Sequence, residues 1–281
     1  MEVTADLHTH STASDGDFSP IQLVELAATK GLKAISLTDH DTLKGIPLAL
    51  ESGNRHAVDV IVGVEISAEY DPGTLHILGY FPFYPVGLED ALTQVQTARR
   101  ERVPRVVKKL NDLGIMLTEA DITEFTGDGQ IGRPHIAKAL LKKGYVRTFD
   151  EAFDEFLGKG KKAYVPKEKM TWKKAIGLIR EHAGLPVLAH PFTLYHAESD
   201  LTSFIQGLRK AGLVGIEALY PDHTPEDTSL YLRMAQDLGL LITGGTDFHG
   251  TEHKTVSLGD YGIDSTLFEI FCTRLKGSFT S

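Results

Sequence analysis

Short runs of apolar and β-branched residues recur along the chain, and most are continuously apolar instead of alternating with polar residues. The runs are Val3–Leu7, Lys33–Leu37, Asp59–Ile66, Leu75–Tyr80, Pro186–Ala189, Val214–Leu219 and Leu240–Thr243. Continuous apolar runs are typical of parallel strands that are covered on both faces. The pattern therefore predicts seven strands in a parallel sheet.

Amphipathic helices with recognisable ends separate these runs. Ser19 before Pro20 is a helix N-cap followed by proline at the first helical position. Glycines that follow a helical pattern and precede an apolar residue mark helix ends, because glycine accepts the left-handed conformation. They are Gly31, Gly114, Gly144, Gly184, Gly212 and Gly239. The repetition of strand, loop and helix predicts βα units.

Residues 86–165 interrupt the alternation and contain no strand pattern. Helices are expected over Leu88–Leu113, Arg133–Lys143 and Thr148–Leu157. We therefore expect a catalytic barrel formed by residues 1–85 and 166–281, with residues 86–165 as a helical insertion domain that caps the substrate.

Charge adds little to this picture. The net charge of −9 over 281 residues argues against a broad surface that coats nucleic acid. Residues 86–165 carry 14 Lys and Arg against 12 Asp and Glu. This mildly basic segment suits an anionic substrate, although solvated helix faces would give the same balance.

Composition favours a cytoplasmic protein. No apolar run approaches the roughly 20 residues that span a bilayer, and the N-terminus lacks the basic and apolar regions of a secretory signal. Cys272 is the only cysteine, so no intrachain disulfide can form. A chain without disulfides suits a reducing compartment.

Many of the twelve histidines, together with several carboxylates, fall near the ends of predicted strands. In chain order these residues are His8, His10, Asp15, His40, Glu65, His76, His190, Asp247 and His249. In a parallel barrel the carboxyl ends of all strands converge on one face, where such enzymes have their active sites. The side chains are therefore expected to meet.

The spacing of these residues indicates a metal site. His8 and His10 point to the same side of an extended segment, so one metal can bind both, and Asp247 and His249 repeat the spacing. Imidazole suits zinc, iron or manganese, and a carboxylate can bridge two cations. Without metal, the crowded charges would repel one another and lose their hydration.

Each of these histidines taken alone would more often be an ordinary core or loop residue. Two neighbouring carboxylates have simpler interpretations: Asp41 as the cap of the following helix, and Asp39 as a residue that orients His40.

At these residues the sequence resembles the PHP (polymerase and histidinol phosphatase) family. The motifs that carry the resemblance are DLHTHSTASDG at 6–16, LTDHD at 37–41, GVEIS at 63–67, LHILGY at 75–80, AHP at 189–191 and TDFH at 246–249. They run nearly from end to end, although DxHxH alone also occurs in amidohydrolases. The resemblance implies a distorted (β/α)7 TIM-like barrel with a small helical insertion after strand four.

The resemblance also implies three metal positions. His8, His10, Glu65 and Asp247 would bind one metal. Glu65, His76 and His190 would bind a second, with Glu65 bridging the two. Asp15, His40 and His249 would bind the third.

Two further segments resemble the nucleoside 3′,5′-bisphosphate phosphatase and 5′-exoribonuclease subgroup. They are IGRPHIA at 131–137 and IEALYPDH at 216–223. The resemblance implies that Arg133, His135 and His223 contact the substrate phosphate. Arg133 could instead be a surface ion-pair residue, and the segment before His223 could be an ordinary turn.

The leading hypothesis is a metal-dependent phosphoric ester hydrolase that uses a metal-bound hydroxide and two or three divalent ions (Mn, Zn or Fe). Arg133 would stabilise charge on the phosphate, and His223 or a water held by Asp247 would protonate the leaving oxygen. The expected substrate is a nucleoside 3′,5′-bisphosphate, which would yield the 5′-monophosphate. No membrane partner and no stable binding to duplex nucleic acid are expected.

Several alternatives stay open. The first is a 5′→3′ exoribonuclease acting on short 5′-phosphorylated RNA, although the insertion has few aromatics for base stacking. The segment at 131–137 argues against a histidinol-phosphate phosphatase. The chain length and intact ligand set argue against a non-catalytic polymerase module. An amidohydrolase would usually have a bridging lysine on strand four, and none lies near His76.

Overall fold

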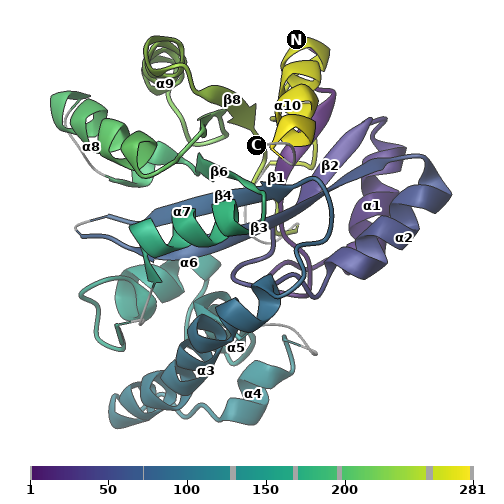
Figure 1. Cartoon of the computed structure of the whole chain (residues 1–281). Helices are drawn as coiled ribbons and strands as arrows, with labels where there is room; N and C mark the ends of the chain where they lie inside the picture. Colours follow the sequence, from purple (N-terminus) through teal and green to yellow (C-terminus); the bar gives the residue numbers. More distant parts are fainter. Residues whose placement is uncertain are drawn as a thin grey trace.

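In a computed structural model of the chain, short strands form the centre of the molecule and helices surround them (Figure 1). The structure describes residues 2–71, 73–126, 131–166, 170–194, 198–250 and 256–278. Hydrogen bonds join the main strands in the order β1-β2-β3-β4-β6-β7-β8. Their bounds are β1 Ala5–Thr9, β2 Ala34–Leu37, β3 Asp59–Glu69, β4 Leu75–Phe81, β6 Leu185–Leu188, β7 Gly215–Leu219 and β8 Leu241–Gly244. All seven predicted strands are present, and a short β5, Met170–Thr171, pairs with the end of β3.

One strand runs against the prediction of a parallel sheet. β4 is antiparallel to both of its neighbours, β3 and β6. β3 and β4 form a hairpin in which Ser67 lies opposite His76. Because β4 runs backwards, its first residues lie at the end of the barrel where the parallel strands finish. His76 therefore reaches the same face as the other histidines.

Contacts between β1 and the segment after β8 nearly close the sheet. The Asp247 N–H donates to the His8 carbonyl at 2.8 Å, and the His10 N–H donates to the Phe248 carbonyl at 2.9 Å. Gly245 permits this approach, because a Cβ at that position would lie 2.5 Å from the backbone nitrogen of His8. The fold is the distorted seven-stranded α/β barrel that was predicted.

The helices of the barrel lie around the sheet, and α1 begins where its sequence signal predicts. They are α1 Pro20–Thr29, α2 Ile46–His56, α7 Trp172–Glu181, α8 Glu198–Lys210, α9 Pro225–Leu238 and α10 Ser265–Gly277, with the short 3-10 helix η2 at Pro191–Leu194. Ser19 caps α1 as predicted, and its side chain accepts from the Gln22 N–H in a capping box. Val24 and Ala27 of α1 are fully buried in the main core, which orients the helix against the sheet.

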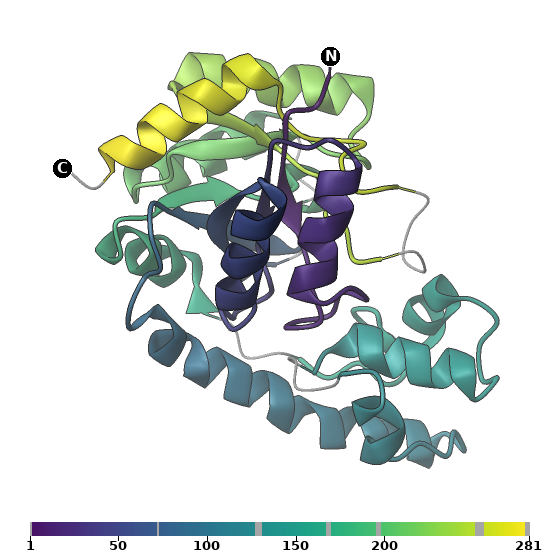
Figure 2. The same cartoon turned by 90° about the vertical axis from the view of Figure 1, so that its right-hand side faces the viewer.

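The insertion is helical, as expected, and contains α3 Leu88–Asp112, α4 Glu119–Thr123, α5 Arg133–Lys142, α6 Phe149–Ala152 and the π-helix η1 Phe153–Leu157. The short α4 was not predicted. Buried apolar side chains of the insertion, among them Leu110, Ile122 and Leu140, form a cluster of their own. Figure 2 shows these helices lying across the end of the barrel from which the chain enters α1 and α2.

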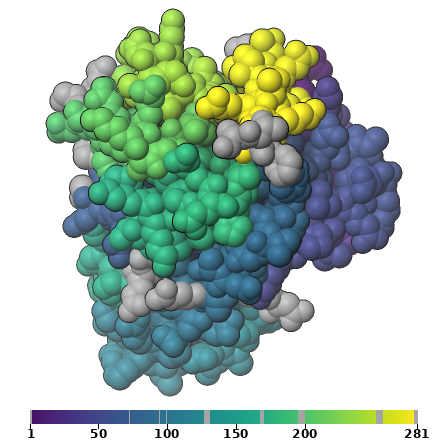
Figure 3. Space-filling view, viewed as in Figure 1, coloured from purple at the N-terminus to yellow at the C-terminus, as the bar shows by residue number. Residues whose placement is uncertain are grey.

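The two ends of the molecule are therefore covered by different elements. Figure 3 shows the insertion, in blue to teal, at one end and helices α8, α9 and α10, in green to yellow, at the other. Within the described parts of the chain, no helix combines the length and apolar character needed to cross a membrane.

Candidate metal centre

Four predicted ligands converge between β1, β3 and the end of β8. This Asp247 group consists of His8, His10, Glu65 and Asp247, whose ligand atoms lie within 4.8 Å of one another. The Nε2 atoms of His8 and His10 lie 3.3 and 3.1 Å from Oδ1 of Asp247. The same two nitrogens lie 3.5 and 3.4 Å from Oε2 of Glu65. Two imidazoles and two carboxylates suit zinc, iron or manganese.

Glu65 connects this group to a second one. The His76 group consists of His40, Glu65 and His76, again within 4.8 Å. Oε1 of Glu65 lies 2.7 Å from Nδ1 of His76 and 3.0 Å from Nε2 of His190. His190 thus lies beside Glu65, as the family resemblance implies. His40 joins them because its Nδ1 lies 2.8 Å from Oε2 of Glu65.

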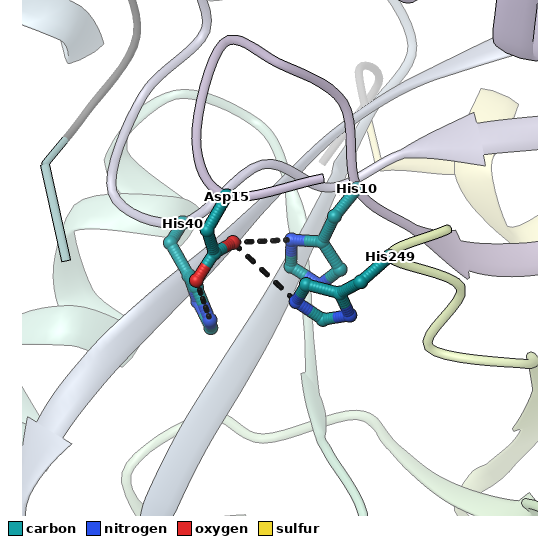
Figure 4. A group of neighbouring side chains, drawn as sticks. All are labelled: His10, Asp15, His40 and His249. Carbon is teal, nitrogen blue, oxygen red and sulfur yellow. Dashed lines mark ion pairs between the residues drawn. The ribbon is translucent and has the colours of Figure 1, made fainter. Parts of the chain in front are cut away.

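The third set surrounds Asp15 (Figure 4). This His249 group consists of His10, Asp15, His40 and His249. Oδ1 of Asp15 lies 3.4 Å from Nε2 of His249 and 3.9 Å from Nδ1 of His10, while Oδ2 lies 3.7 Å from Nε2 of His40. The structure therefore brings all nine predicted ligands together, with His190 beside Glu65. His10, His40 and Glu65 each belong to two groups, whereas the resemblance implied two places only for Glu65.

Burial and opposite charges act against each other in this cluster. Burial lowers the pKa of His10, but the neighbouring carboxylates of Asp247 and Glu65 outweigh burial and raise it to about 10. Burial raises the pKa of Glu65, yet His76 and other imidazoles hold it well below its usual range. At His76 burial prevails and lowers the pKa to about 3. Protonated imidazoles thus balance the carboxylates, a task that divalent cations can take over by displacing protons.

The backbone is strained where it delivers ligands. His190 and Asp247 have φ values of 25° and 52°, and Asp41, which follows His40, has φ 54°. Non-glycine residues in this region cost roughly 1–3 kcal/mol each, and such residues concentrate at functional sites. The strain is consistent with a functional role for this end of the barrel.

Two residues that were not predicted as site residues support the ligands. The fully buried Glu217 on β7 accepts from Nδ1 of His8 at 3.0 Å and from the backbone N–H of His190 at 2.8 Å. Because a carboxylate can only accept there, Nδ1 of His8 carries the proton and its Nε2 is left for a metal. Similarly, the Tyr220 hydroxyl donates to Oδ2 of Asp247 at 2.8 Å and leaves Oδ1 facing the cluster.

The interpretation of Asp39 as a residue that orients His40 is wrong. Its carboxylate accepts from the Ser11 N–H at 2.8 Å and from the Ser14 hydroxyl at 2.6 Å. Asp39 therefore fixes the loop after β1, which carries the candidate ligand Asp15. The prediction was wrong because proximity in sequence does not determine which way a buried carboxylate points.

Asp41 does not cap the following helix either. Its carboxylate accepts from the Ser67 N–H at 2.9 Å, and the N-cap position of α2 is occupied by Gly45, which has no side chain to cap with. With its positive φ, Asp41 instead links the loop after β2 to the last residues of β3.

Arg133 and His135 begin α5, at the start of the segment that was predicted to bind phosphate. The Arg133 guanidinium donates to the Leu157 carbonyl at 3.1 Å and lies 5.8 Å from the centre of the Phe153 ring. The buried His135 accepts from the Gly132 N–H through Nδ1 at 3.0 Å. In neutral His135 the proton is therefore on Nε2, where it can be donated.

His223 lies among aromatic rings beside the cluster. Its Nδ1 lies 3.0 Å from the Ala218 carbonyl, so Nδ1 carries a proton. Nε2 is buried and has no hydrogen-bond partner among the described residues. Burial lowers the pKa of the ring. The rings of Phe192 and Tyr220 lie 5.5 and 5.1 Å away. At neutral pH, therefore, His223 presents a hydrogen-bond acceptor.

The donor set fits divalent metal ions. Buried ligand atoms that lack a hydrogen-bond partner among the described residues gather in the cluster, and they are His8 Nε2, His10 Nε2, Asp15 Oδ1, His40 Nδ1 and Glu65 Oε2. Unsatisfied buried polar atoms are rare and usually mark an ion or water. An α/β barrel with such a cluster at the carboxyl ends of its strands is the architecture of metal-dependent hydrolases.

Comparison with known proteins agrees with this class. The family model for the PHP domain matches residues 6–179. A 5′-3′ exoribonuclease of Haemophilus influenzae is 34% identical over 87% of this chain and 89% of its own. A 3′,5′-nucleoside bisphosphate phosphatase of Chromobacterium violaceum is 30% identical over 87% of this chain and 86% of its own. A Bifidobacterium adolescentis structure classed as a metal-dependent phosphoesterase superposes with a TM-score of 0.87 at 27% identity, covering 96% of both chains.

The chain belongs to the PHP domain family and is a phosphoesterase of that family. The resemblance seen in the sequence motifs is therefore confirmed. The individual ligand and substrate-contact assignments remain predictions.

Proposed function

We propose that this enzyme removes phosphate from small nucleotides, with a nucleoside 3′,5′-bisphosphate as the leading substrate. The observation that carries the proposal is the convergence of nine candidate ligands in one cluster, in a chain whose insertion has the nucleotide subgroup's pattern at 131–137. The relative named as a bisphosphate phosphatase supports the same substrate class.

Two or three divalent ions (manganese, zinc or iron) would be held by the Asp247, His76 and His249 groups, with His190 beside Glu65. When bound, such ions supply Lewis acidity, which activates water for attack on phosphorus and neutralises charge on phosphate oxygens. Glu217 and Tyr220 would hold His8 and Asp247 in the orientation that metal binding needs.

The chain's own donors and acceptors would then position the substrate. We propose that residues 86–165 form a domain that closes over the nucleotide. Arg133 would swing from the Leu157 carbonyl to phosphate oxygens, since a guanidinium fork matches them well. His135 would donate from Nε2. His223 would take up a proton as the anionic substrate arrives, because a nearby negative charge favours the charged ring, and could then protonate the leaving oxygen.

A 5′→3′ exoribonuclease acting on short 5′-phosphorylated RNA is the second candidate. The relative named as a 5′-3′ exoribonuclease favours it, because the two sequences are 34% identical over most of both chains. Both activities would use the same metal cluster, so only the substrate separates them.

The first test is phosphate release from adenosine 3′,5′-bisphosphate by purified protein, with manganese and after chelation. We expect rapid release of the 3′-phosphate that stops when metal is removed. Cleavage of 5′-phosphorylated RNA or histidinol phosphate without release from the bisphosphate would overturn the substrate proposal while leaving the metal chemistry in place.

The ligand assignments can be tested with two substitutions. His190→Ala and Asp247→Ala should abolish turnover while circular dichroism remains that of a folded protein, because each removes a donor from the cluster. The exposed residues His56 and Asp237 provide the matched controls His56→Ala and Asp237→Ala, which should keep full activity. Wild-type turnover in Asp247→Ala would contradict the assignment.

The role of His223 makes a prediction about pH. A proton donor acts in its protonated form, so kcat should fall as pH rises through the pKa of His223 in the substrate complex. In the free enzyme, burial lowers the pKa of His223 below its ordinary value. His223→Gln should lower kcat and remove this limb of the kcat profile. An unchanged limb in the variant would assign the proton to another group.

A further inference from the structure

A carboxylate of the insertion holds the loop that follows β2. Glu89, in the first turn of α3, accepts from the Thr42 hydroxyl at 3.1 Å and from the Leu43 N–H at 2.6 Å. Thr42 and Leu43 come directly after His40 and Asp41 in the chain. The position of the His40 loop therefore depends on a residue of the insertion.

Gln96, two turns further along α3, strengthens this contact. Its Nε2 donates to the Asp41 carbonyl and to Oε1 of Glu89, both at 2.9 Å. Gln96 is only 6% exposed, so water competes little for these bonds. The two side chains together bond to three consecutive residues after His40, including the strained Asp41.

A second helix of the insertion reaches the other loops of the same metal group. Lys138 on α5 forms an ion pair with Asp17 in which the lysine is only 7% exposed. The Asp17 N–H in turn donates to the carbonyl of His249 at 2.7 Å. Asp17 follows Asp15 by two positions, so Lys138 is connected to two ligands of the His249 group.

A further ion pair between insertion and barrel is different in character. Lys159 pairs with Asp71, but the two side chains are 55% and 80% exposed. Solvent-exposed pairs contribute little because water and salt screen them. The connections through Glu89, Gln96 and Lys138 are less exposed than this pair, and all lead to loops that carry ligands of the His249 group.

We propose that the helical insertion positions the ligands of the His249 group, so that metal occupancy at this position depends on Glu89, Gln96 and Lys138. This inference rests on the metal-binding part of the proposed function. The physical reason is that Asp15, His40 and His249 lie on loops beyond the strand ends, which the sheet itself fixes less firmly. Groups that orient ligands from behind change metal affinity by roughly 10- to 100-fold.

The test compares two neighbouring acidic residues of α3. Glu89→Gln keeps the size of the side chain but replaces one acceptor oxygen with a donor. In either orientation of the amide, this donor would face another N–H, that of Leu43 or that of the Gln96 side chain. Asp90→Asn removes the same charge from the same helical turn, where Asp90 is exposed. Manganese binding to both variants and to wild type is measured by calorimetric titration, and bound manganese is counted by mass spectrometry after dialysis.

Two reference variants identify which metal position is affected. His249→Ala removes a ligand of the His249 group, and His190→Ala removes one beside Glu65. We expect Glu89→Gln to weaken, by tenfold or more, the class of manganese sites that His249→Ala loses. The class that His190→Ala loses should weaken less, because of the supported loops only the His40 loop also belongs to the His76 group. Asp90→Asn should bind as wild type does.

Substitutions of Lys138 test the proposal independently of Glu89. Lys138→Gln should weaken the same class of sites, Lys138→Arg should restore it in part, and Lys142→Gln on the exposed side of α5 should have no effect. Should Lys138→Gln fail to fold, manganese binding to Glu89→Gln and Lys138→Arg tests the proposal instead. Equal binding by Glu89→Gln and Asp90→Asn, or equal weakening of all classes, would overturn the proposal. Because no substrate is used, a wrong substrate assignment leaves this result unaffected.

Discussion

At the scale of single residues, the contact with the clearest consequence is the one between Glu217 and His8. A carboxylate behind a histidine fixes both the tautomer and the direction of the ring, and it makes the other nitrogen a better ligand. Glu217 also receives the backbone N–H of His190, so one buried side chain orients ligands from two different strands.

Glu217→Gln should therefore reduce metal affinity or activity by roughly 10- to 100-fold, because an amide can donate where the carboxylate accepted. Activity measured against manganese concentration would reveal the loss as a shift to higher metal. Glu226→Gln on the exposed start of α9 is the control. A wild-type metal dependence in Glu217→Gln would mean that His8 needs no such support.

The sequence allowed the nine candidate ligands to be named, because imidazoles and carboxylates near strand ends form an unusual pattern. The supporting residues were harder to predict. Glu217 did leave a signal, since an isolated charge within an apolar run such as Val214–Leu219 must be paired when buried. The direction of Asp39 left none, because it depends on which loop serines lie within reach.

At the scale of secondary-structure elements, the direction of β4 is the main correction. The apolar pattern of Leu75–Tyr80 is the same in either direction. The informative feature was the connection, because the few residues between β3 and β4 suffice for a hairpin, whereas a parallel crossover needs a dozen or more. Strand positions could thus be predicted from hydrophobicity, while strand direction required loop length as well.

The close approach of β1 to the segment after β8 predicts a marked effect at Gly245. Gly245→Ala would place a methyl group 2.5 Å from the His8 backbone, at a cost of roughly 1–3 kcal/mol. It should also weaken manganese binding, since His8 and Asp247 would be pushed apart. Gly207→Ala in α8 is the control, because a Cβ at that position would have no atom within 4 Å. It should leave manganese binding unchanged and raise the free energy of unfolding by up to about 1 kcal/mol. Thermal melting and metal titration of both variants would test this.

At the scale of the whole molecule, metal binding should raise the stability of the entire barrel. A ligand that binds only the folded state adds about 2.7 kcal/mol when its free concentration is roughly 100 times Kd. The melting temperature should therefore rise with manganese concentration and fall on chelation. Asp247→Ala should respond much less. A melting temperature that is independent of metal in the wild type would contradict a cluster that forms only in the folded chain.

The closure of the sheet has a consequence for the biosynthesis of the protein. Asp6 and Thr246 are 240 positions apart in the chain, yet their side chains form a hydrogen bond of 2.6 Å beneath the cluster. A ribosome-bound chain therefore carries His8 and His10 long before Asp247 and His249 have been synthesised. Until the segment after β8 has emerged, neither the Asp247 group nor the His249 group is complete, so any metal held by these two groups would bind only after Asp247 and His249 have been synthesised.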